Sequence, residues 1–571
     1  MSQRTVYLET FGCQMNELDS ELVAGQLSSL GYRFTARADD AQVVLYNTCS
    51  VREHAEQKVW SRLGELAVRK RAEPGLVVGV LGCMAERDGA GLMTRMPVVD
   101  MMVGPGELDK LPALLDNAVR TRESLLADEP GTRGPHERSA KQAALQGNTS
   151  RRTATLAAAE DTLELLDLSR SISPVDVAGS HHEHSSAGPR SAYVRITRGC
   201  NKFCTYCVVP FTRGAEIHRP PEHIIDECKK LADAGVIEVT LLGQTVNHYR
   251  FEHGAAVAVG GVLQPQKGRA FGGGHARDPM AGATVTTFAD LLRRIHDEVP
   301  AIKRLRFVTS YPRDFGDDVL EVIRDHQRLC RYLHVPAQTG SDRLLKMMNR
   351  GYTVAEYLEF VDRARAHLDQ PELGRPLTIS GDFIVGFPTE TDEDFDATVA
   401  LVERVRYKNA FIFKYSPRPG TIAYDKLADD VPEATKRARN NALLAAQGRI
   451  SDSISRAMIG QSVDVFVEGE SKRERKKVKA EAREKPGLVS LTIGGKASND
   501  DGCGDDCGCA AKTQVLGPAA GPTQLVGRTD GDNIVFFDAP PGGGEWAGRF
   551  ARVRVTDATG LSLQGEWVSA G

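Results

Sequence analysis

The sequence has little of several features that mark particular classes of protein. The net charge is only −4 over 571 residues, so no overall excess of basic residues indicates a nucleic-acid partner. No stretch of about 18 apolar residues is present, so no segment is expected to cross a membrane. The N-terminus, MSQRTVY, lacks the apolar core of a secretory signal. We therefore expect a cytoplasmic protein.

A disulfide framework is also not expected. The chain has 11 cysteines, an odd number, spread over its whole length, whereas small disulfide-rich domains use an even, closely spaced set. Hydrophobic residues make up 41% of the chain and charged residues 26%, which is ordinary for a soluble protein. The length predicts about three to four domains. The thiols are therefore free to bind metal in a reducing compartment.

Three cysteines lie close together in the pattern C-x3-C-x2-C: Cys200, Cys204 and Cys207. Cysteine thiolates are the usual ligands of iron–sulfur clusters, and their spacing is diagnostic. Three thiolates on one loop hold three irons of a cubane and leave the fourth iron open to a small molecule. A zinc knuckle is the alternative, but zinc usually takes four ligands and no fourth Cys or His follows closely. The pattern favours a 4Fe-4S cluster over zinc or three unrelated thiols.

Residues 1–118 alternate short apolar runs with helical patterns. Such alternation predicts a doubly wound parallel sheet. We expect strands at 5–9, 42–46, 76–81 and 98–103, and helices at 19–30 and 52–69.

Cys13, Cys49 and Cys83 each follow the end of one of these predicted strands. Ligand sites of open α/β sheets lie beyond the carboxyl ends of the strands. Each cysteine alone is more typical of a buried core residue, but three at one edge of a sheet indicate a shared site. We predict a second cluster there.

Residues 119–190 break the pattern and are rich in Ala, Ser, Gly, Thr and charge. This composition is typical of a linker, here with some helical tendency. Its histidines His181, His182 and His184 could bind metal, but a solvated linker is the favoured interpretation.

Residues 191–454 carry a second strand–helix series, in which the cysteine triad follows the first strand. Six βα units predict an open, partial (β/α)6 barrel, whose sites lie at the C-terminal ends of its strands. The Gly- and Ala-rich segment 251–285 is expected as a loop insertion. The expected strands are 192–197, 238–242, 305–309, 332–335, 378–384 and 410–415.

Residues 455–571 have an all-β pattern and resemble the TRAM module, a small RNA-binding β-barrel. Alternating Val and Arg at 552–555 give one strand a basic face. An insertion at 470–520 contains Cys503, Cys507 and Cys509 in a glycine-rich, acidic run that we do not expect catalysis to require. The expected strands are 463–468, 488–493, 524–528, 533–538 and 549–557.

The order of these parts resembles one family, the methylthiotransferases of the radical S-adenosylmethionine (SAM) superfamily. The cysteine triad with an aromatic residue, Tyr206, before its last cysteine is similar to the superfamily signature. The N-terminal stretches TFGCQMN (10–16), NTCSVRE (47–53) and KVWSRLG (58–64) resemble the tRNA branch, the MiaB type. Further matches are LLGQ (241–244), TSYP (309–312), LHVPAQTGS (333–341), MNRGYT (348–353) and DFIVGFPTE (382–390).

The resemblance implies two 4Fe-4S clusters, with Cys13, Cys49 and Cys83 holding one and Cys200, Cys204 and Cys207 the other. It also implies SAM as radical source and methyl donor. The SAM contacts it suggests are Tyr206, Gly243, Gln244, Ser310 and Asp382. For the last four, loop structure at strand ends is the alternative role. Four positions depart from the family pattern. His218 and Tyr311 stand where Ser and His are common, and Thr245 and Thr339 stand where Asn and Ser are common.

The implied reaction adds a methylthio group to C2 of N6-isopentenyladenosine next to the anticodon of tRNA. This carbon is an unactivated aryl C–H that no side-chain base deprotonates, so the chemistry belongs to the cofactor. The implied partners are a single-stranded tRNA anticodon loop, an electron donor such as flavodoxin or ferredoxin, and a sulfur source, with the enzyme a monomer. Arg528, Arg549, Arg552 and Arg554 are expected to contact RNA phosphates.

Two alternative functions stay open at this point. One is methylthiolation of a ribosomal protein by the same chemistry, but that branch has a Pro-Lys-Asn type motif after its first cysteine and Gly after its second, where this chain has Gln14 and Ser50. The other is a non-catalytic iron–sulfur module that binds RNA, against which the intact triad argues.

Overall fold

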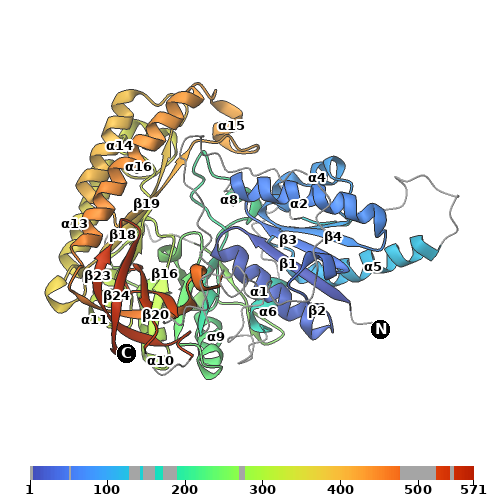
Figure 1. Cartoon of the computed structure of the whole chain (residues 1–571), viewed down its shortest axis with the longest axis horizontal. Coiled ribbons are helices and arrows are strands. Elements are labelled where there is room, and N and C mark those ends of the chain that lie inside the picture. Colours follow the sequence, from blue (N-terminus) through green and yellow to red (C-terminus); the bar gives the residue numbers. More distant parts are fainter. Residues whose placement is uncertain are drawn as a thin grey trace, which may run out of the picture.

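The chain forms three units of regular structure in a computed structural model (Figure 1). The expected strand at 488–493, the histidines at 181–184 and Cys503, Cys507 and Cys509 lie outside the described residues. None of the described helices is long and apolar enough to span a membrane. The structure describes residues 4–50, 53–127, 142–145, 161–170, 190–268, 277–475, 523–540 and 545–571.

The N-terminal unit is a parallel sheet with strand order β2-β1-β3-β4-β5-β6. Every residue of β3 and β4 is buried, as expected for strands covered on both faces. Helices α1 and α5 pack on one face, and α2, α3 and α4 on the other, which confirms the doubly wound prediction. The strands are β1 (Thr5–Phe11), β2 (Arg33–Phe34), β3 (Val43–Thr48), β4 (Val77–Gly82), β5 (Met101–Val103) and β6 (Gln142–Ala144). The helices are α1 (Gln14–Ser29), α2 (Glu53–Ala72), α3 (Cys83–Asp88), α4 (Ala90–Arg95) and α5 (Leu111–Ala127).

The segment 119–190, expected as a linker, contributes to the folded structure. Strand β6 extends the sheet, and helix α6 (Thr162–Leu168) packs Leu163 and Leu166 into the core beneath it. The side chain of Asp161 accepts a hydrogen bond from the Glu164 N–H and so caps α6. The sequence did not predict this helix, because its two core leucines form only a short apolar pattern and the residues on either side are mostly polar.

The central unit has six parallel strands in two groups, β7-β10-β16 and β17-β18-β19. They coincide with the six predicted strands to within a few residues and confirm the open, partial barrel. One hydrophobic core fills the space between the strands and the outer helices. The strands are β7 (Ser191–Arg195), β10 (Glu238–Leu242), β16 (Arg304–Phe307), β17 (Tyr332–His334), β18 (Thr378–Val385) and β19 (Asn409–Lys414). The helices are α9 (Pro221–Asp233), α10 (Phe288–Glu298), α11 (Asp317–Asp325), α12 (Asp342–Met347), α13 (Val354–Leu368), α14 (Asp392–Val405), α15 (Ile422–Lys426) and α16 (Glu433–Arg456).

The insertion at 251–285, expected as a loop, contains short strands. β12 and β13 form a hairpin whose turn, Gly260–Gly261, has φ of +59° and +85°, the left-handed region that glycine adopts readily. β14 pairs antiparallel with β9, and β11 with β15. The strands are β9 (Ile217–His218), β11 (Arg250–Glu252), β12 (Ala258–Val259), β13 (Val262–Leu263), β14 (Gln266–Lys267) and β15 (Val285–Thr287).

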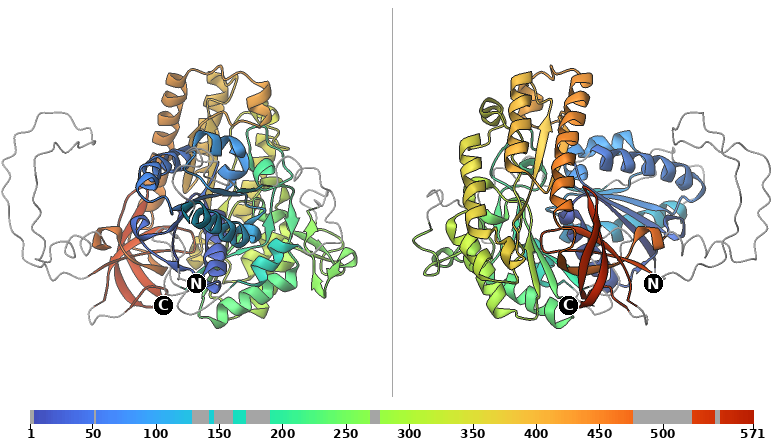
Figure 2. Two further views of the ribbon diagram at one scale, coloured as in Figure 1. Left: turned by 90° about the vertical axis from the view of Figure 1, so that its right-hand side faces the viewer. Right: turned by 60° about the vertical axis from the view of Figure 1, so that its left-hand side comes forward.

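The C-terminal unit is a closed five-stranded barrel of order β20-β21-β22-β24-β23, which confirms the predicted barrel. The last strand was not predicted; it lies parallel to β22 and closes the barrel. Arg306 of β16 pairs with Asp532 at 2.9 Å and Arg304 donates to the Arg528 carbonyl at 2.8 Å, so the barrel is fixed to the central unit (Figure 2). The strands are β20 (Ser462–Glu470), β21 (Gln524–Arg528), β22 (Ile534–Asp538), β23 (Phe550–Ala558) and β24 (Ser562–Ala570).

A buried ionic network holds the N-terminal sheet against the central unit. Arg195, at the end of β7, pairs with Asp19 of α1 at 3.1 Å and with Asp167 of α6 at 2.7 Å. Arg219 pairs with Glu164 of α6 at 3.0 Å. All of these side chains are buried. Helix α6 therefore supplies the negative charges that balance two buried arginines of the central unit.

Replacing Asp167 by alanine is expected to destabilise the protein strongly. Arg195 would then keep only Asp19, and Arg219 only Glu164 and Glu227, so two buried arginines would share one negative charge fewer. Breaking a buried pair costs about 3–5 kcal/mol. Denaturant unfolding of the purified variant measures the change. The matched control is Asp452→Ala, which removes an exposed pair with Arg456 and should change the free energy of unfolding by less than about 0.5 kcal/mol. Equal values for the two variants would contradict the expectation.

Candidate functional site

The central cysteine triad lies on a loop between β8 (Thr197–Arg198) and α8 (Val209–Thr212). Cys204 is buried, and Cys200 and Cys207 are half-buried. Burial raises the pKa of Cys200 to about 11. Burial and then the neighbouring Cys204 and Cys200 raise the pKa of Cys207. The thiols therefore lie close enough to influence one another, and iron must displace their protons in order to bind.

Arg350 places a buried positive charge beside this triad. Its Nη1 donates to Cys204 Sγ at 3.4 Å, its Nη2 to the Pro336 carbonyl at 2.9 Å and its Nε to the Tyr352 hydroxyl at 3.0 Å. The guanidinium also lies 4.8 Å from the centre of the Tyr311 ring. Among the described residues it has no ion pair with a carboxylate. The sequence analysis matched the motif around Arg350 to the family but gave this residue no role.

The predicted SAM contacts lie at the carboxyl ends of the barrel strands, except Tyr206. Gly243 and Gln244 follow β10, Ser310 follows β16, and Asp382 lies in β18. Tyr206 lies on the triad loop and packs beside a small apolar cluster.

Hydrogen bonds join these strand ends. The Val246 N–H donates to the Thr309 carbonyl at 3.1 Å, and the Ser310 N–H to the His334 carbonyl at 3.0 Å. The Nε2 of His334 lies 3.1 Å from Asp382 Oδ1. The structure thus brings Gln244, Ser310 and Asp382 to one edge, the edge from which the triad loop also leaves.

Two of these residues carry polar atoms suited to a ligand. Gln244 Oε1 and Ser310 Oγ are buried and have no hydrogen-bond partner among the described residues. Leaving such groups unpaired is costly, so they fit a polar ligand such as the methionine part of SAM. Thr309, just before Ser310, has φ of +67°, which is strained for a β-branched residue. A side chain on Gly243 would collide with Thr197 Oγ1, so the loop needs glycine there.

The N-terminal cysteines meet at the carboxyl edge of the first sheet. Cys13 lies two residues after β1, and Cys49 and Cys83 directly follow β3 and β4, which are adjacent strands. A hydrogen bond from Cys49 outweighs burial and, with the charge of Arg213, lowers the pKa of Cys13 to about 5. Burial raises the pKa of Cys83, on which the charge of Cys13 also acts. Cys13 thus interacts with both Cys49 and Cys83, and the cluster expected at these three thiols stays a prediction.

Arg213 connects the two cysteine sites. It follows α8 directly, pairs with Asp19 of α1 at 2.8 Å and acts electrostatically on Cys13 and Cys83. Helix α8 also packs against α3, which begins at Cys83. In Figure 1, α8 lies between the N-terminal sheet and the central unit. Only one short helix thus separates the two sites, an arrangement that the sequence analysis did not foresee.

The four arginines expected to contact RNA differ in their surroundings. Arg528 pairs with Asp532 at 3.2 Å, at the junction with the central unit, and is not free for phosphate. Arg549 and Arg554 are exposed and Arg552 is half-buried. These three lie at or within one strand, β23. Arg552 pairs with Asp464 at 2.9 Å and Arg554 with Glu566 at 3.4 Å, but both pairs are exposed, so a polyanion can reach these arginines.

Two family profiles match the chain, and relatives match nearly all of it. The profile described as "Uncharacterized protein family UPF0004" matches residues 5–104, and "Radical SAM superfamily" matches residues 194–402. A tRNA-2-methylthio-N(6)-dimethylallyladenosine synthase of Rhodopirellula baltica is 39% identical over 562 residues, 98% of this chain and 95% of the relative. The enzyme of the same name from Porphyromonas gingivalis is 35% identical over 569 residues, 99% of this chain and 95% of the relative. Among solved structures, a radical S-adenosylmethionine methyltransferase of Kitasatospora setae has a TM-score of 0.45 and 18% identity, covering 74% of each chain.

Proposed function

Because this chain belongs to the family of tRNA-2-methylthio-N(6)-dimethylallyladenosine synthases, which are radical SAM enzymes, we propose that it adds a methylthio group to C2 of N6-isopentenyladenosine beside the anticodon of tRNA. The observation that carries the proposal is the pair of cysteine triads, one at the carboxyl edge of each parallel unit, with α8 between them. Two such sites suit a reaction that needs both a radical and a sulfur atom.

The residues of each triad fit a 4Fe-4S cluster with one open iron. Cys200, Cys204 and Cys207 would hold one cluster, and Cys13, Cys49 and Cys83 the other. When bound, the clusters and SAM supply the radical, the methyl group and the sulfur. An electron donor such as flavodoxin or ferredoxin and a sulfur source complete the set of partners, in the cytoplasm where tRNA is available.

The side chains around the triads have supporting roles. Arg350 sets a positive charge beside Cys204, which favours an anionic cluster there. Gln244 and Ser310 offer polar atoms to SAM. Arg213 and Asp19 hold the loop of the central triad against the N-terminal rim, so the separation of the two sites is fixed by a buried ion pair.

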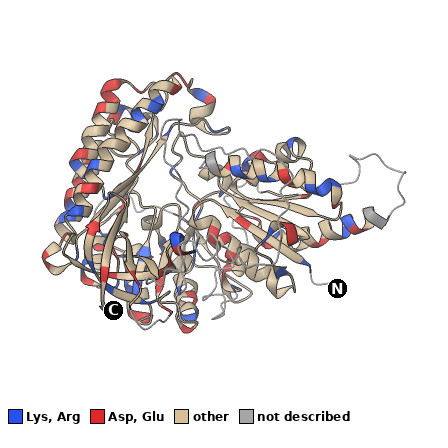
Figure 3. Cartoon of the chain, viewed as in Figure 1, with Lys and Arg blue, Asp and Glu red and all other residues tan. Residues whose placement is uncertain are grey.

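RNA binding does not depend on one large basic face. Basic and acidic residues alternate along α13, α14 and α16 in Figure 3, in keeping with the net charge of −4. The C-terminal barrel instead offers a few arginines near one strand, which suits contacts to the phosphates of a single-stranded loop.

Replacing Arg549, Arg552 and Arg554 together by alanine is expected to weaken tRNA binding and to reduce its dependence on salt. Each lost phosphate contact lowers the salt slope by about 0.7 for single-stranded RNA, so the slope should fall by about 2. The affinity for tRNA is measured by retention of the protein–tRNA complex on filters at several salt concentrations, from low to physiological. Arg404→Ala, on the exposed face of α14, is the matched control and should bind as the wild type does. An unchanged slope in the triple variant would refute the role of β23.

Nucleoside analysis of tRNA tests the proposed function. Cells that lack this chain should accumulate N6-isopentenyladenosine without the methylthio group, and the gene should restore the modification. A Cys200→Ala chain should fail to restore it. Complete methylthiolation of tRNA in the deleted strain, with loss of the modification from a ribosomal protein, would instead establish the alternative function.

A further inference from the structure

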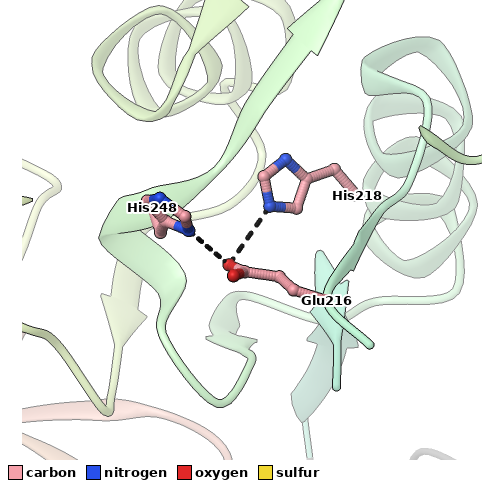
Figure 4. A group of neighbouring side chains, drawn as sticks. All are labelled: Glu216, His218 and His248. Atoms are coloured by element: carbon pink, nitrogen blue, oxygen red, sulfur yellow. Dashed lines mark hydrogen bonds and ion pairs between the residues drawn. The ribbon is translucent and has the colours of Figure 1, made fainter. Parts of the chain in front are cut away.

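Three buried side chains beside the central triad form a cluster that the methylthiolation reaction does not use: Glu216, His218 and His248 (Figure 4). His218 lies in β9 and Glu216 just before it, whereas His248 ends the 3-10 turn η4 (Val246–His248) after β10. Their exposed fractions are 0%, 0% and 8%. Both imidazole rings point at the carboxylate in Figure 4.

The distances are those of a potential ligand set. Glu216 Oε1 lies 2.7 Å from His248 Nδ1 and 3.3 Å from His218 Nε2. One ligand atom from each residue lies within 4.8 Å of the other two. A tetrahedral zinc ion with bonds of about 2.0–2.2 Å separates its ligands by about 3.3 Å. To hold an ion, Glu216 Oε1 and His248 Nδ1 would move apart by about 0.6 Å, whereas Glu216 Oε1 and His218 Nε2 already have this spacing.

Hydrogen bonding alone leaves the cluster incomplete. Both imidazole rings contact the same carboxylate oxygen, Glu216 Oε1. Glu216 Oε2 and His248 Nε2 are buried and have no hydrogen-bond partner among the described residues. Buried polar atoms normally have a partner, because burying them unpaired costs free energy. An ion bound by both oxygens of Glu216 would satisfy Oε2.

The main chain orients His218 as metal sites usually require. In the tautomer that leaves Nε2 free to bind an ion, His218 Nδ1–H donates to the Arg250 carbonyl at 2.8 Å, which holds the ring with Nε2 toward Glu216. Histidines that bind metals commonly donate their other ring N–H to a backbone carbonyl in this way.

The insertion at 251–285 closes this cluster. Strand β14 pairs with β9, and the Gly268 N–H donates to the Glu216 carbonyl at 2.9 Å. A Cβ atom on Gly268 would lie 2.7 Å from Glu216 Cγ and 2.8 Å from His218 Nε2, so the insertion backbone forms a wall of the cluster. On the other side, the Glu216 N–H donates to Asn201 Oδ1 at 3.1 Å, and Asn201 follows Cys200.

We propose that Glu216, His218 and His248 bind one divalent transition-metal ion, Zn²⁺ or Fe²⁺, separate from both iron–sulfur clusters. Two imidazoles and one carboxylate suit either ion when water takes the remaining position, as at zinc sites with two histidines and one glutamate. The ion joins the segment of β9 to the turn that follows β10, and the Glu216 N–H also donates to Asn201, the residue after Cys200, so the ion steadies a segment in contact with the triad loop. None of the six cluster cysteines contributes to it.

Metal analysis of the full-length protein tests the site. Protein with both clusters loaded is incubated with Zn²⁺ alone or with Fe²⁺ alone, passed over a desalting column and analysed by mass spectrometry of its metals. Wild type should keep one more equivalent per chain than His248→Gln. His326→Gln, in the more exposed group of His296, Asp297 and His326, is the matched control and should retain it. Mössbauer spectra separate a single Fe²⁺ from cluster iron, so the two arms show which ion binds.

A second measurement covers the case in which His248→Gln does not fold. Ligands that bind only the native state raise its melting temperature. Zn²⁺ or Fe²⁺ should therefore raise the melting temperature of wild type and of His326→Gln, but not that of the isosteric variant Glu216→Gln. Equal metal content in wild type, Glu216→Gln and His248→Gln, or a wild type with neither extra metal nor a thermal shift, would overturn the proposal and leave a hydrogen-bonded cluster only.

Discussion

Replacing any one of Cys200, Cys204 and Cys207 by alanine should abolish the reductive cleavage of SAM. Each cysteine is one of three protein ligands at the proposed open-iron cluster, and the side chain that donates a hydrogen bond to Cys204 is the cation of Arg350, which cannot replace a thiolate. The measurement is 5′-deoxyadenosine formed by anaerobically reconstituted, chemically reduced protein. Wild type should form it, and the three variants should give none above the background of free iron and sulfide.

The chain supplies its own control for this series. Cys228 and Cys330 are buried cysteines in the hydrophobic core and beside it, away from both triads. Cys228→Ala and Cys330→Ala should lose some stability but should still cleave SAM. Wild-type rates of deoxyadenosine formation in a Cys200, Cys204 or Cys207 variant would exclude the cluster assignment.

Replacing Cys13, Cys49 and Cys83 together should abolish methylthiolation of tRNA but leave the cleavage of SAM. Bound iron should fall by half, because one of two equal clusters is lost, and methylthiolation of tRNA should disappear. Cleavage of SAM should persist, because the central triad lies on a different unit and keeps its own ligands. Iron content, deoxyadenosine and modified nucleoside are measured on the same preparation.

The outcome that contradicts this second expectation is unchanged iron in the triple variant, which would make these cysteines ordinary core residues. Complete loss of SAM cleavage would show instead that the rim is needed to fold the central loop. Arg213 would then explain the loss, because it follows the central loop in the chain and its charge acts on Cys13 and Cys83.

The strands and the two cysteine sites could be predicted because their signals are local. β3 and β4 are continuous apolar runs, which only a sheet covered on both faces buries completely. Cys49 and Cys83 follow these two strands and Cys13 follows β1, and parallel strands bring their carboxyl ends to one edge. The convergence of Cys13, Cys49 and Cys83 therefore follows from strand order and needs no knowledge of tertiary contacts.

The parts that escaped prediction depend on contacts between residues far apart in the chain. Arg195 and Asp167 read as ordinary charged residues until α6 docks between the two units. Arg528 was expected to be a surface arginine. Its pairing with Asp532 could not be predicted, because Asp532 also binds Arg306 of β16 and so lies where the barrel packs on the central unit. The Glu216–His248 pair likewise joins positions 32 residues apart that no spacing rule links.

The position of Arg350 ties the lifetime of the protein to the supply of iron. Its guanidinium is buried without a carboxylate partner among the described residues, and its nearest anionic candidate is the sulfur of Cys204. An unbalanced buried charge costs several kcal/mol, which a cluster bound at the triad would offset. We therefore expect chains made when iron is scarce to be partly unfolded more often and cut by proteases, so that their abundance falls without any change in synthesis.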